Sequence, residues 1–257
     1  MNKKTIVITG STRGLGSGLA REFLELGHQV VVNGRTEDAV AGALKSLQNS
    51  SAEIIGVSGN VSVEETHYKL LKQATDTFGK VDIWINNAGI PQPFMELIRI
   101  ENHKIRSLLD TNVFGLVLGS KIAADHMIQQ GWGKIFNMEG FGSDGRTMKK
   151  LTVYGTSKRA VNYFTKSLSK ELKGSPVQAG ILSPGMVRTD FIKIPAISGS
   201  EDEKKRFKKV QDILAEDVDI VSSFLVARLL KSNKNYDRIE YLTKTKLVFK
   251  MLKMLVR

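Results

Sequence analysis

The sequence predicts an α/β fold in which a single doubly wound parallel sheet carries helices on both faces. Short β-branched runs alternate along the chain with longer amphipathic stretches, as right-handed βαβ crossovers require. The short runs are apolar throughout rather than alternating, which is typical of parallel strands buried on both faces. No linker or internal repeat interrupts the pattern, so we expect one domain over residues 1–257.

The first half of the chain supplies four of the expected strands and three helices. The strands are Thr5–Ile8, Gln29–Val32, Glu53–Val57 and Ile83–Ile85. The helices are Leu15–Leu26, which Gly27 ends as a C-cap, then Glu37–Gln48 and Val63–Phe78. Ligands of such sheets bind at the carboxyl ends of the strands, so the loops that follow the strands are the place to look for a site.

The second half continues the alternation and then becomes less regular. We expect a long helix around His103–Gln129, a strand at Lys134–Asn137, a helix at Tyr154–Leu172, and strands at Val177–Leu182 and Arg238–Thr243. The segment at about 188–210 is expected to form a mobile lid over the substrate.

Composition excludes several classes of function. The chain has no cysteine, which rules out disulfides, thiolate metal sites and cysteine nucleophiles. Its four histidines lack metal-ligand spacing, so no metal site is expected. The first apolar run is too short for a signal peptide and no run reaches the length of a membrane span, so we expect a cytoplasmic protein.

The chain is strongly basic, with a formal net charge of +12. Such a field attracts anions, including nucleotide cofactors, nucleic acid and acidic lipid surfaces. A solvated basic face is the plain alternative. The sequence contains no recognised nucleic-acid-binding module, so nucleic acid is not an expected partner.

A glycine-rich loop follows the first expected strand. Glycines let the backbone approach a pyrophosphate, and the N-terminus of the following helix favours an anion. The strand–loop–helix context therefore predicts a phosphate cradle of the Rossmann type. Its residues are Gly10, Ser11, Thr12, Arg13, Gly14, Leu15 and Gly16.

The loop has the spacing Gly-x-x-x-Gly-x-Gly, and from here to about Asp190 the chain resembles the short-chain dehydrogenase/reductase family. Four further motifs follow in order: Asn86–Gly89, Asn112, Tyr154-x-x-x-Lys158 and the Pro-Gly turn in Ser183–Thr189. The resemblance implies a nicotinamide dinucleotide cofactor and a homo-oligomer, either a dimer or a tetramer. The cofactor contacts it implies beyond the glycine loop are Asn60, Val61, Asn87, Ala88, Gly89, Tyr154, Lys158, Pro184, Gly185, Val187 and Thr189.

The end of the second strand favours NADP(H) over NAD(H). Gly34 stands where an acidic side chain would bind the ribose hydroxyls of NAD, and Arg35 follows it. Arg35 and Arg13 could clamp a 2′-phosphate through charge-assisted hydrogen bonds. Alternatively, either arginine is simply exposed to solvent. Asn60 stands where the family often has an aspartate near the adenine, and a neutral amide can still hydrogen-bond the ring.

Tyr154 and Lys158 are the candidate catalytic pair. Four residues apart on a helix, they lie on one face. A neighbouring ammonium stabilises a phenolate, so we expect Lys158 to lower the pKa of Tyr154 and to let it exchange a proton with a carbonyl or alcohol oxygen. The resemblance also implies that Lys158 reaches the nicotinamide ribose and that Asn112 holds a water that relays protons to Lys158.

The third catalytic partner is less evident from the sequence. The family places a serine about thirteen residues before the tyrosine, where this chain has Phe141, and its frequent Ser-Ser pair is replaced by Glu139-Gly140. Ser143 is the nearest candidate to polarise the substrate oxygen. The alternative for Ser143 is a serine that caps a turn.

Three stretches resemble the chlorophyll b reductase branch, which reduces a formyl group to a hydroxymethyl group. They are Phe136–Gly140, Gly142–Gly145 and Ser183–Val187. We therefore expect an NADPH-dependent reductase that transfers hydride to an aldehyde or ketone of a lipophilic substrate, or the reverse alcohol oxidation. A relative acting on another aldehyde or ketone fits as well. The alternative from another class is a non-catalytic NADP-binding regulatory or scaffold protein.

The C-terminal tail, residues 244–257, mixes bulky apolar residues with cations. As a helix it has a broad apolar face and a basic face, and such a helix could lie on an anionic membrane surface, as a peripheral contact. The alternative is a helix that packs on the body of the protein or on a partner subunit.

Overall fold

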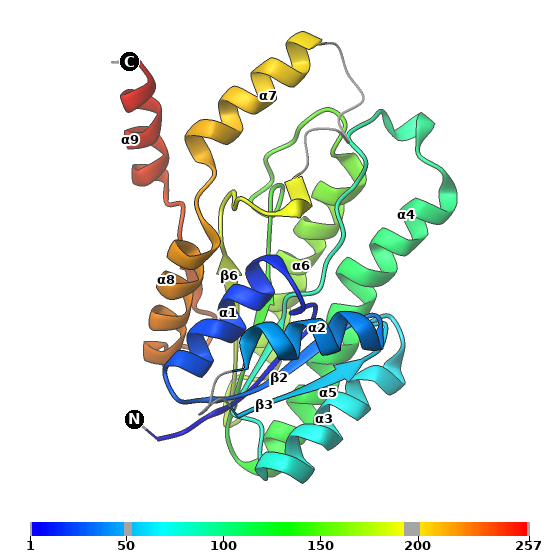
Figure 1. Ribbon diagram of the computed structural model, residues 1–257, viewed down its shortest axis with the longest axis vertical. Helices are drawn as coiled ribbons and strands as arrows, with labels where there is room; N and C mark the ends of the chain where they lie inside the picture. The colour runs from blue at the N-terminus through cyan, green and yellow to red at the C-terminus, as the bar shows by residue number, and fades with distance from the viewer. Residues whose placement is uncertain (1, 49–52, 193–200, 256–257) are drawn as a thin grey trace.

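The computed structural model describes residues 2–48, 53–192 and 201–255 and confirms the predicted α/β architecture (Figure 1). Within these residues seven strands form one sheet in the order β3-β2-β1-β4-β5-β6-β7. Every pairing in this sheet is parallel. The order reverses direction between β1 and β4, which places a ligand crevice at the carboxyl ends of these strands.

The strands are β1 (Thr5–Ile8), β2 (Gln29–Gly34), β3 (Glu53–Ser58), β4 (Ile83–Asn86), β5 (Gly133–Met138), β6 (Val177–Ser183) and β7 (Arg238–Glu240). The α-helices are α1 (Gly14–Glu25), α2 (Glu37–Leu47), α3 (Glu64–Phe78), α4 (Asn102–Leu109), α5 (Gly115–Gln130), α6 (Thr152–Glu171), α7 (Glu201–Leu214), α8 (Val218–Lys231) and α9 (Lys244–Leu255). Three short helical segments are η1 (Leu97–Arg99), η2 (Asp110–Phe114) and η3 (Asp190–Ile192).

Both faces of the sheet are buried, which explains why the strands are apolar throughout. Ile6 and Ile8 of β1 belong to a core cluster that includes Phe23 of α1 and Leu225 of α8. Val7, between them, points to the opposite face and joins a second cluster with residues of α3 and α5. Each layer of helices therefore buries alternate side chains of the same strands.

Two helical regions differ from the sequence prediction. Helix α8 was not predicted, although Val221, Leu225 and Leu229 on it are fully buried. The expected helix around His103–Gln129 is divided into α4 and α5 by η2, a π-helical turn. The turn widens the helix at Asn112 and is a feature often found at functional sites.

The C-terminal third agrees with the prediction in outline. The last strand is shorter than expected, covering Arg238–Glu240 rather than Arg238–Thr243. The expected lid at 188–210 contains η3 and the first part of α7, and its residues 193–200 lie outside the described residues. The tail is helical over Lys244–Leu255, as expected.

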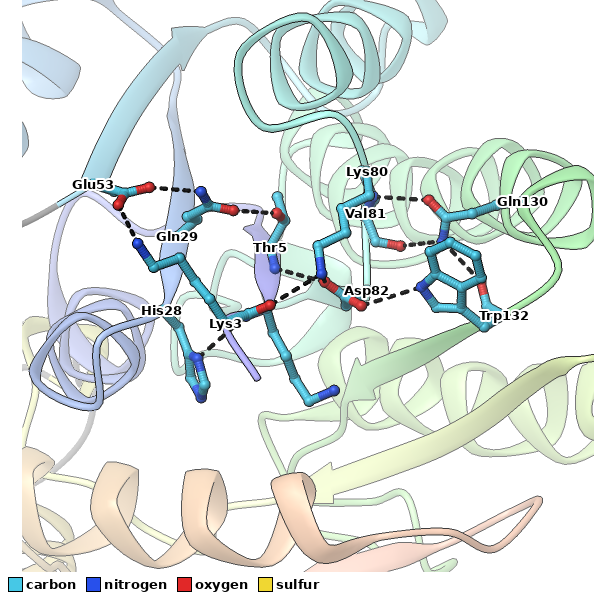
Figure 2. A network of polar contacts seen from close by, with 11 residues as sticks. Lys3, Thr5, His28, Gln29, Glu53, Lys80, Val81, Asp82, Gln130 and Trp132 are labelled. Carbon is cyan, nitrogen blue, oxygen red and sulfur yellow. Dashed lines mark hydrogen bonds and ion pairs between the residues drawn. The ribbon is translucent and has the colours of Figure 1, made fainter. Parts of the chain in front are cut away.

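A polar network closes the amino-terminal edge of the sheet, opposite the ligand crevice (Figure 2). The Asp82 carboxylate accepts hydrogen bonds from the Thr5 N–H at 2.8 Å and from the Trp132 indole at 3.1 Å, and it pairs with Lys80 at 3.1 Å. Glu53, which opens β3, bonds Lys3 and Gln29. These contacts hold the first residues of the strands at the amino-terminal edge, opposite the edge where a ligand would bind.

Helices α7 and α9 pack against each other and project beyond the body at the carboxyl edge (Figure 1). They follow β6 and β7, so both arise from the side of the sheet where the crevice lies. In the described residues, no helix combines the length and the apolar character needed to cross a bilayer.

The contact between α1 and α8 gives a test of the fold. A Cβ added at Gly18 would lie 2.4 Å from a methyl of Val218 and 2.9 Å from the Ser222 hydroxyl, whereas one at Gly42 on α2 would meet nothing within 4 Å. We expect Gly18→Ala to lower the free energy of unfolding by ~1–3 kcal/mol through overpacking. Gly42→Ala should raise it by ~0.5–1 kcal/mol. Urea denaturation of the two variants measures both values, and equal effects would contradict the packing.

Candidate active site

The glycine loop between β1 and α1 lies directly against the loop that follows β4. Gly10 has φ +61°, and a Cβ there would lie 2.7 Å from the Ala88 Cα. A Cβ at Gly16 would lie 2.5 Å from the Asn87 amide nitrogen. The glycines are therefore required for close backbone packing, and the loop leads into the N-terminus of α1 at Gly14.

Asn87 and Thr9 join these two loops by hydrogen bonds. The Asn87 amide donates to the carbonyl oxygens of Thr9 at 3.0 Å and Gly10 at 2.9 Å. The Thr9 hydroxyl in turn accepts from the N–H groups of Asn87 and Ala88, both at 3.1 Å. The predicted cofactor residues Asn87, Ala88 and Gly89 are thus brought beside the predicted phosphate cradle.

Asn33 is a central residue of this edge that the sequence analysis did not single out. Its buried amide accepts a hydrogen bond from the Gly10 N–H at 3.1 Å and donates to the carbonyls of Val57 at 3.1 Å and Gly59 at 3.2 Å. It therefore ties together the ends of β1, β2 and β3. The sequence feature that could have indicated this role is a polar residue inside an otherwise apolar strand.

Ser11 was predicted to bind the cofactor, and the structure gives its side chain a different task. The buried hydroxyl donates to the Ile8 carbonyl at 2.6 Å and accepts from the Asn33 N–H at 3.0 Å. It holds the shape of the loop together with the Ser11 N–H, which donates to the Asn33 carbonyl at 2.9 Å.

The region expected to select the cofactor has no room for an acidic side chain. A Cβ at Gly34 would lie 2.4 Å from a methyl of Thr12 and 3.2 Å from a methyl of Val40. Arg13, in the glycine loop, and Arg35, which directly follows Gly34, are both exposed. The two guanidinium groups are therefore accessible to an anionic ligand.

The loop after β3 contains two further residues expected to contact the cofactor, Asn60 near the adenine and Val61. Asn60 is exposed, and its side-chain oxygen accepts a hydrogen bond from the Ser62 N–H at 3.1 Å. Val61 is buried, and its carbonyl contacts the His67 ring nitrogen at 2.7 Å. Desolvation lowers the pKa of His67, which keeps this buried ring neutral.

The Pro-Gly turn after β6 reaches the start of α1. A Cβ at Gly14 would lie 3.4 Å from a methyl of Thr189, so these two predicted contacts are neighbours. Gly185 has φ +74° in the turn. Val187 is buried and pairs with Glu216 in a single parallel β-bridge, which anchors the turn beside the start of α8.

Tyr154 and Lys158 come together on α6, as predicted. The Lys158 ammonium lies 5.8 Å from the centre of the Tyr154 ring and donates to the Met138 carbonyl at 3.0 Å. Burial lowers the pKa of Lys158 to about 8, and the negative charge of Glu139 opposes that shift. Burial raises the pKa of Tyr154 well above its usual value, so desolvation outweighs the expected lowering by Lys158.

Asn112 supports the same centre from the π-helical turn. Its amide is buried, accepts from the Ile90 N–H at 2.8 Å, and donates to the Ile90 carbonyl at 3.0 Å and the Ser157 hydroxyl at 3.2 Å. Gly89 lies between Asn112 and Lys158, because a Cβ there would be 3.4 Å and 3.7 Å from their polar atoms. The water relay through Asn112 stays a prediction.

Gly140 is the residue that approaches the Tyr154 hydroxyl. A Cβ there would lie 2.4 Å from that oxygen and 3.3 Å from the side chain of Lys158. Ser143 lies in the turn that follows and is buried, with its carbonyl accepting from Arg159 at 2.9 Å. The catalytic role of Ser143 stays a prediction.

Glu139 also lies at the site, although the sequence analysis gave it no role there. It is 3% exposed, and its carboxylate pairs with Arg238 of β7 at 2.5 Å. Arg238 also pairs with Glu240 at 2.7 Å, and Asn162 of α6 donates to Glu139 at 3.4 Å. A charged residue is therefore enclosed at the end of β5, next to the catalytic pair.

Gln92 fixes the start of α6 and was not predicted. Its buried side-chain oxygen accepts from the N–H groups of Val153 at 2.8 Å and Tyr154 at 3.0 Å, while its nitrogen donates to the Lys150 carbonyl at 2.7 Å. These are N–H groups of the first helical turn, which have no partner inside the helix. Gln92 thereby positions the backbone of Tyr154 from the loop after β4.

Two aromatic pairs involve segments near the catalytic pair. The ring of Phe191 in η3 lies 5.9 Å from that of Tyr154. Phe94, in the loop after β4, lies 5.9 Å from Phe207 of α7, and the Lys150 ammonium lies 5.6 Å from the Phe94 ring.

Comparison with known proteins agrees with the resemblance seen in the sequence. The family model described as short chain dehydrogenase matches residues 4–194. The probable chlorophyll(ide) b reductase NYC1 of Oryza sativa subsp. japonica is 34% identical, over 99% of this chain and 53% of the relative. The chlorophyll(ide) b reductase NOL of Arabidopsis thaliana is 36% identical, over 87% of this chain and 64% of the relative. The chain thus spans between half and two thirds of these relatives.

The fold also matches solved structures. A metagenomic short-chain oxidoreductase in complex with NADP superimposes with a TM-score of 0.74, covering 92% of this chain and 96% of that chain at 20% sequence identity. At this identity the match supports the sheet and helix arrangement and leaves the chemistry to be argued from the residues.

Proposed function

The chain belongs to the short chain dehydrogenase family, and we propose that it is an NADPH-dependent reductase that transfers hydride to an aldehyde or ketone of a lipophilic substrate. The observation that carries this proposal is the Tyr154 hydroxyl, which lies against the bare backbone of Gly140 with the Lys158 ammonium beneath its ring. A protonated phenol beside a buried cation suits proton donation to a carbonyl oxygen.

The residues at the crevice fit a dinucleotide phosphate. The glycine loop offers backbone N–H groups at the N-terminus of α1, where the helix dipole favours an anion. The steric block at Gly34 and the exposed Arg13 and Arg35 favour a 2′-phosphate over bare ribose hydroxyls. These features support NADP(H) as the cofactor.

The proposed reaction uses the raised pKa of Tyr154 directly. When bound, NADPH would supply hydride to the carbonyl carbon. The carbonyl electron pair then moves to oxygen, and the Tyr154 hydroxyl gives that oxygen its proton. Because burial keeps the phenol protonated at neutral pH, the residue is ready to act as an acid. The Lys158 ammonium stabilises the phenolate that remains.

The surroundings of Tyr154 support a lipophilic substrate. Phe191 lies beside the Tyr154 ring, and Phe94 and Phe207 form a second aromatic pair between the loop after β4 and α7. The relatives named chlorophyll(ide) b reductase add support for a formyl group as the reacting centre. The alternative, a non-catalytic NADP-binding protein, is supported by Glu139-Gly140 in place of the family's frequent serine pair, because Gly140 offers no hydroxyl to the Tyr154 side chain.

Replacing Tyr154 by phenylalanine separates these two functions. We expect Tyr154→Phe to reduce kcat for carbonyl reduction by about 100-fold or more, since the proton donor is lost. Binding of NADPH should stay close to that of the unaltered protein. Loss of NADPH absorbance with a panel of lipophilic aldehydes and ketones measures the rate, and fluorescence titration measures binding. Equal rates for both proteins would refute the mechanism, and binding without turnover of any substrate would favour the alternative.

Cofactor selectivity gives a second prediction. Arg35→Asp should raise the KM for NADPH about ten- to a hundredfold, because it replaces a charge-assisted hydrogen-bond donor by a like charge. The KM for NADH should change little. The matched control is Lys45→Asp, which makes the same charge change at an exposed position near the other end of α2. Parallel increases for both cofactors would exclude a 2′-phosphate clamp.

We also propose that α9 makes a peripheral contact with an anionic membrane. The structure turns two of its lysines toward the body: Lys250 pairs with Glu216 at 2.8 Å, and Lys246 lies 3.9 Å from the centre of the Tyr241 ring. Val248 and Phe249 face outward and are 56% and 60% exposed. A docked helix with an outward apolar pair, on a chain of net charge +12, suits shallow insertion into an acidic lipid surface.

The double variant Val248→Ser and Phe249→Ser tests this contact while leaving Lys246 and Lys250 in place. We expect it to lose most co-sedimentation with phosphatidylglycerol vesicles, because the apolar area that enters the lipid is removed. Ile128→Ser, at an exposed apolar site on α5, is the control and should bind normally. Unchanged vesicle binding would remove the proposal. A change in mass by light scattering would instead place this pair in the homo-oligomer interface that we expect from the family.

A further inference from the structure

The end of β5 encloses a charged cluster of Glu139, Arg238 and Glu240. Arg238 bridges the two carboxylates at 2.5 Å and 2.7 Å. The Glu139 side chain is 1% exposed, whereas Glu240 is 31% exposed. Enclosing a carboxylate is costly unless its charge is compensated, and one guanidinium shared by two carboxylates leaves the cluster with a net charge of −1.

We propose that Glu139, held in place by Arg238, is a positioning residue that keeps the Lys158 ammonium charged beneath Tyr154. This rests on the proposed reductase function. Glu139 directly follows Met138, whose carbonyl accepts the hydrogen bond from Lys158 at 3.0 Å. One short stretch of backbone therefore places both the acceptor and the compensating charge for the same ammonium.

The charges around the two groups support this assignment. Among the described residues, Glu139 is the charge that acts on Lys158 from another element, and Tyr154 lies beside it on α6. Around Glu139 stand the cluster partners on β7, together with Tyr236 before β7, whose pKa is raised by burial first and then by the charge of Glu139.

The sign of the effect follows from burial. Burial alone disfavours the ammonium and brings the pKa of Lys158 down to about 8, against the opposing influence of Glu139. Without Glu139 the pKa falls further, and Lys158 becomes neutral within the physiological range. The phenolate left by proton donation would then lose its stabilising cation, so reduction would fail at a lower pH.

Glu139→Gln tests the proposal because it removes the charge and keeps an oxygen that can accept from Arg238. We expect the alkaline limb of the kcat/KM–pH profile for carbonyl reduction to move down by about one pH unit. Glu240→Gln is the matched control. It removes a carboxylate from the same arginine on the exposed side, where solvent screens it, and should move the limb by less than a third as much.

A direct measurement separates this proposal from the proposed function. The Lys158 resonance in protein labelled at lysine Cε, assigned with Lys158→Met, reports the titration of the ammonium with no need for turnover. A lower titration midpoint in Glu139→Gln, with the Glu240→Gln midpoint nearly unchanged, supports the role of Glu139 even if no carbonyl is reduced. An unchanged midpoint overturns it even if the enzyme is an active reductase.

A variant that removes the whole pair covers a failure of Glu139→Gln to fold. Glu139→Gln combined with Arg238→Gln removes the buried ion pair as a unit. It should still move the Lys158 midpoint down, by less than Glu139→Gln alone, because the loss of the Arg238 cation partly offsets the loss of the carboxylate. If this double variant folds and its midpoint equals that of the unaltered protein, the pair has a structural role alone and the proposal is wrong.

Discussion

Buried and half-buried amide side chains hold the carboxyl edge of the sheet, and the active site depends on them. Parallel strands diverge into loops at this edge, which leaves backbone N–H and C=O groups without ladder partners. A buried group left unpaired costs about 1–3 kcal/mol. An asparagine amide both donates and accepts, and Asn33, Asn87 and Asn112 each use both functions or bridge two loop carbonyls. The Asn86 side chain of β4 donates a hydrogen bond to the Asn137 side chain of β5 at 2.8 Å, which extends these amide contacts to the next pair of strands.

This construction has an electrostatic consequence at the catalytic pair. Amides and backbone groups satisfy hydrogen bonds without adding net charge, so Lys158 is enclosed by mostly neutral polar groups. In such surroundings a single charge acts strongly, because little solvent screens it. The raised pKa of Tyr154 and the lowered pKa of Lys158 both follow from the same desolvation. Among the described residues, Glu139 is the carboxylate that acts on Lys158, so its charge matters more here than it would at the surface.

The sequence predicted the parts of the molecule that are encoded locally. Strand positions, the glycine loop and the spacing of Tyr154 and Lys158 all follow from short-range pattern. Helix α8 was not predicted because apolar residues occur almost all around its circumference, so no amphipathic stripe marks it. Gln92 acts across 61 residues on Val153, and Arg238 acts across 99 residues on Glu139. Such partners cannot be identified until the fold brings them together. The pKa of Tyr154 was misjudged because charge proximity is visible in sequence and depth of burial is not.

The contact of Gly140 with Tyr154 and that of Glu139 with Arg238 together explain why Glu139-Gly140 can stand where the family often has two serines. At Gly140 the backbone approaches the Tyr154 hydroxyl so closely that any Cβ would displace the ring, so a residue with a side chain is incompatible with this arrangement. Adjacent residues at the end of a strand point to opposite sides, and the side chain of Glu139 accordingly turns to Arg238. Gly140 lets the backbone approach the proton donor, and Glu139, the residue before it, supplies charge for the cation beside that donor. The dipeptide therefore works as a unit, and restoring a serine at position 140 alone would require Tyr154 to move away from its present contact.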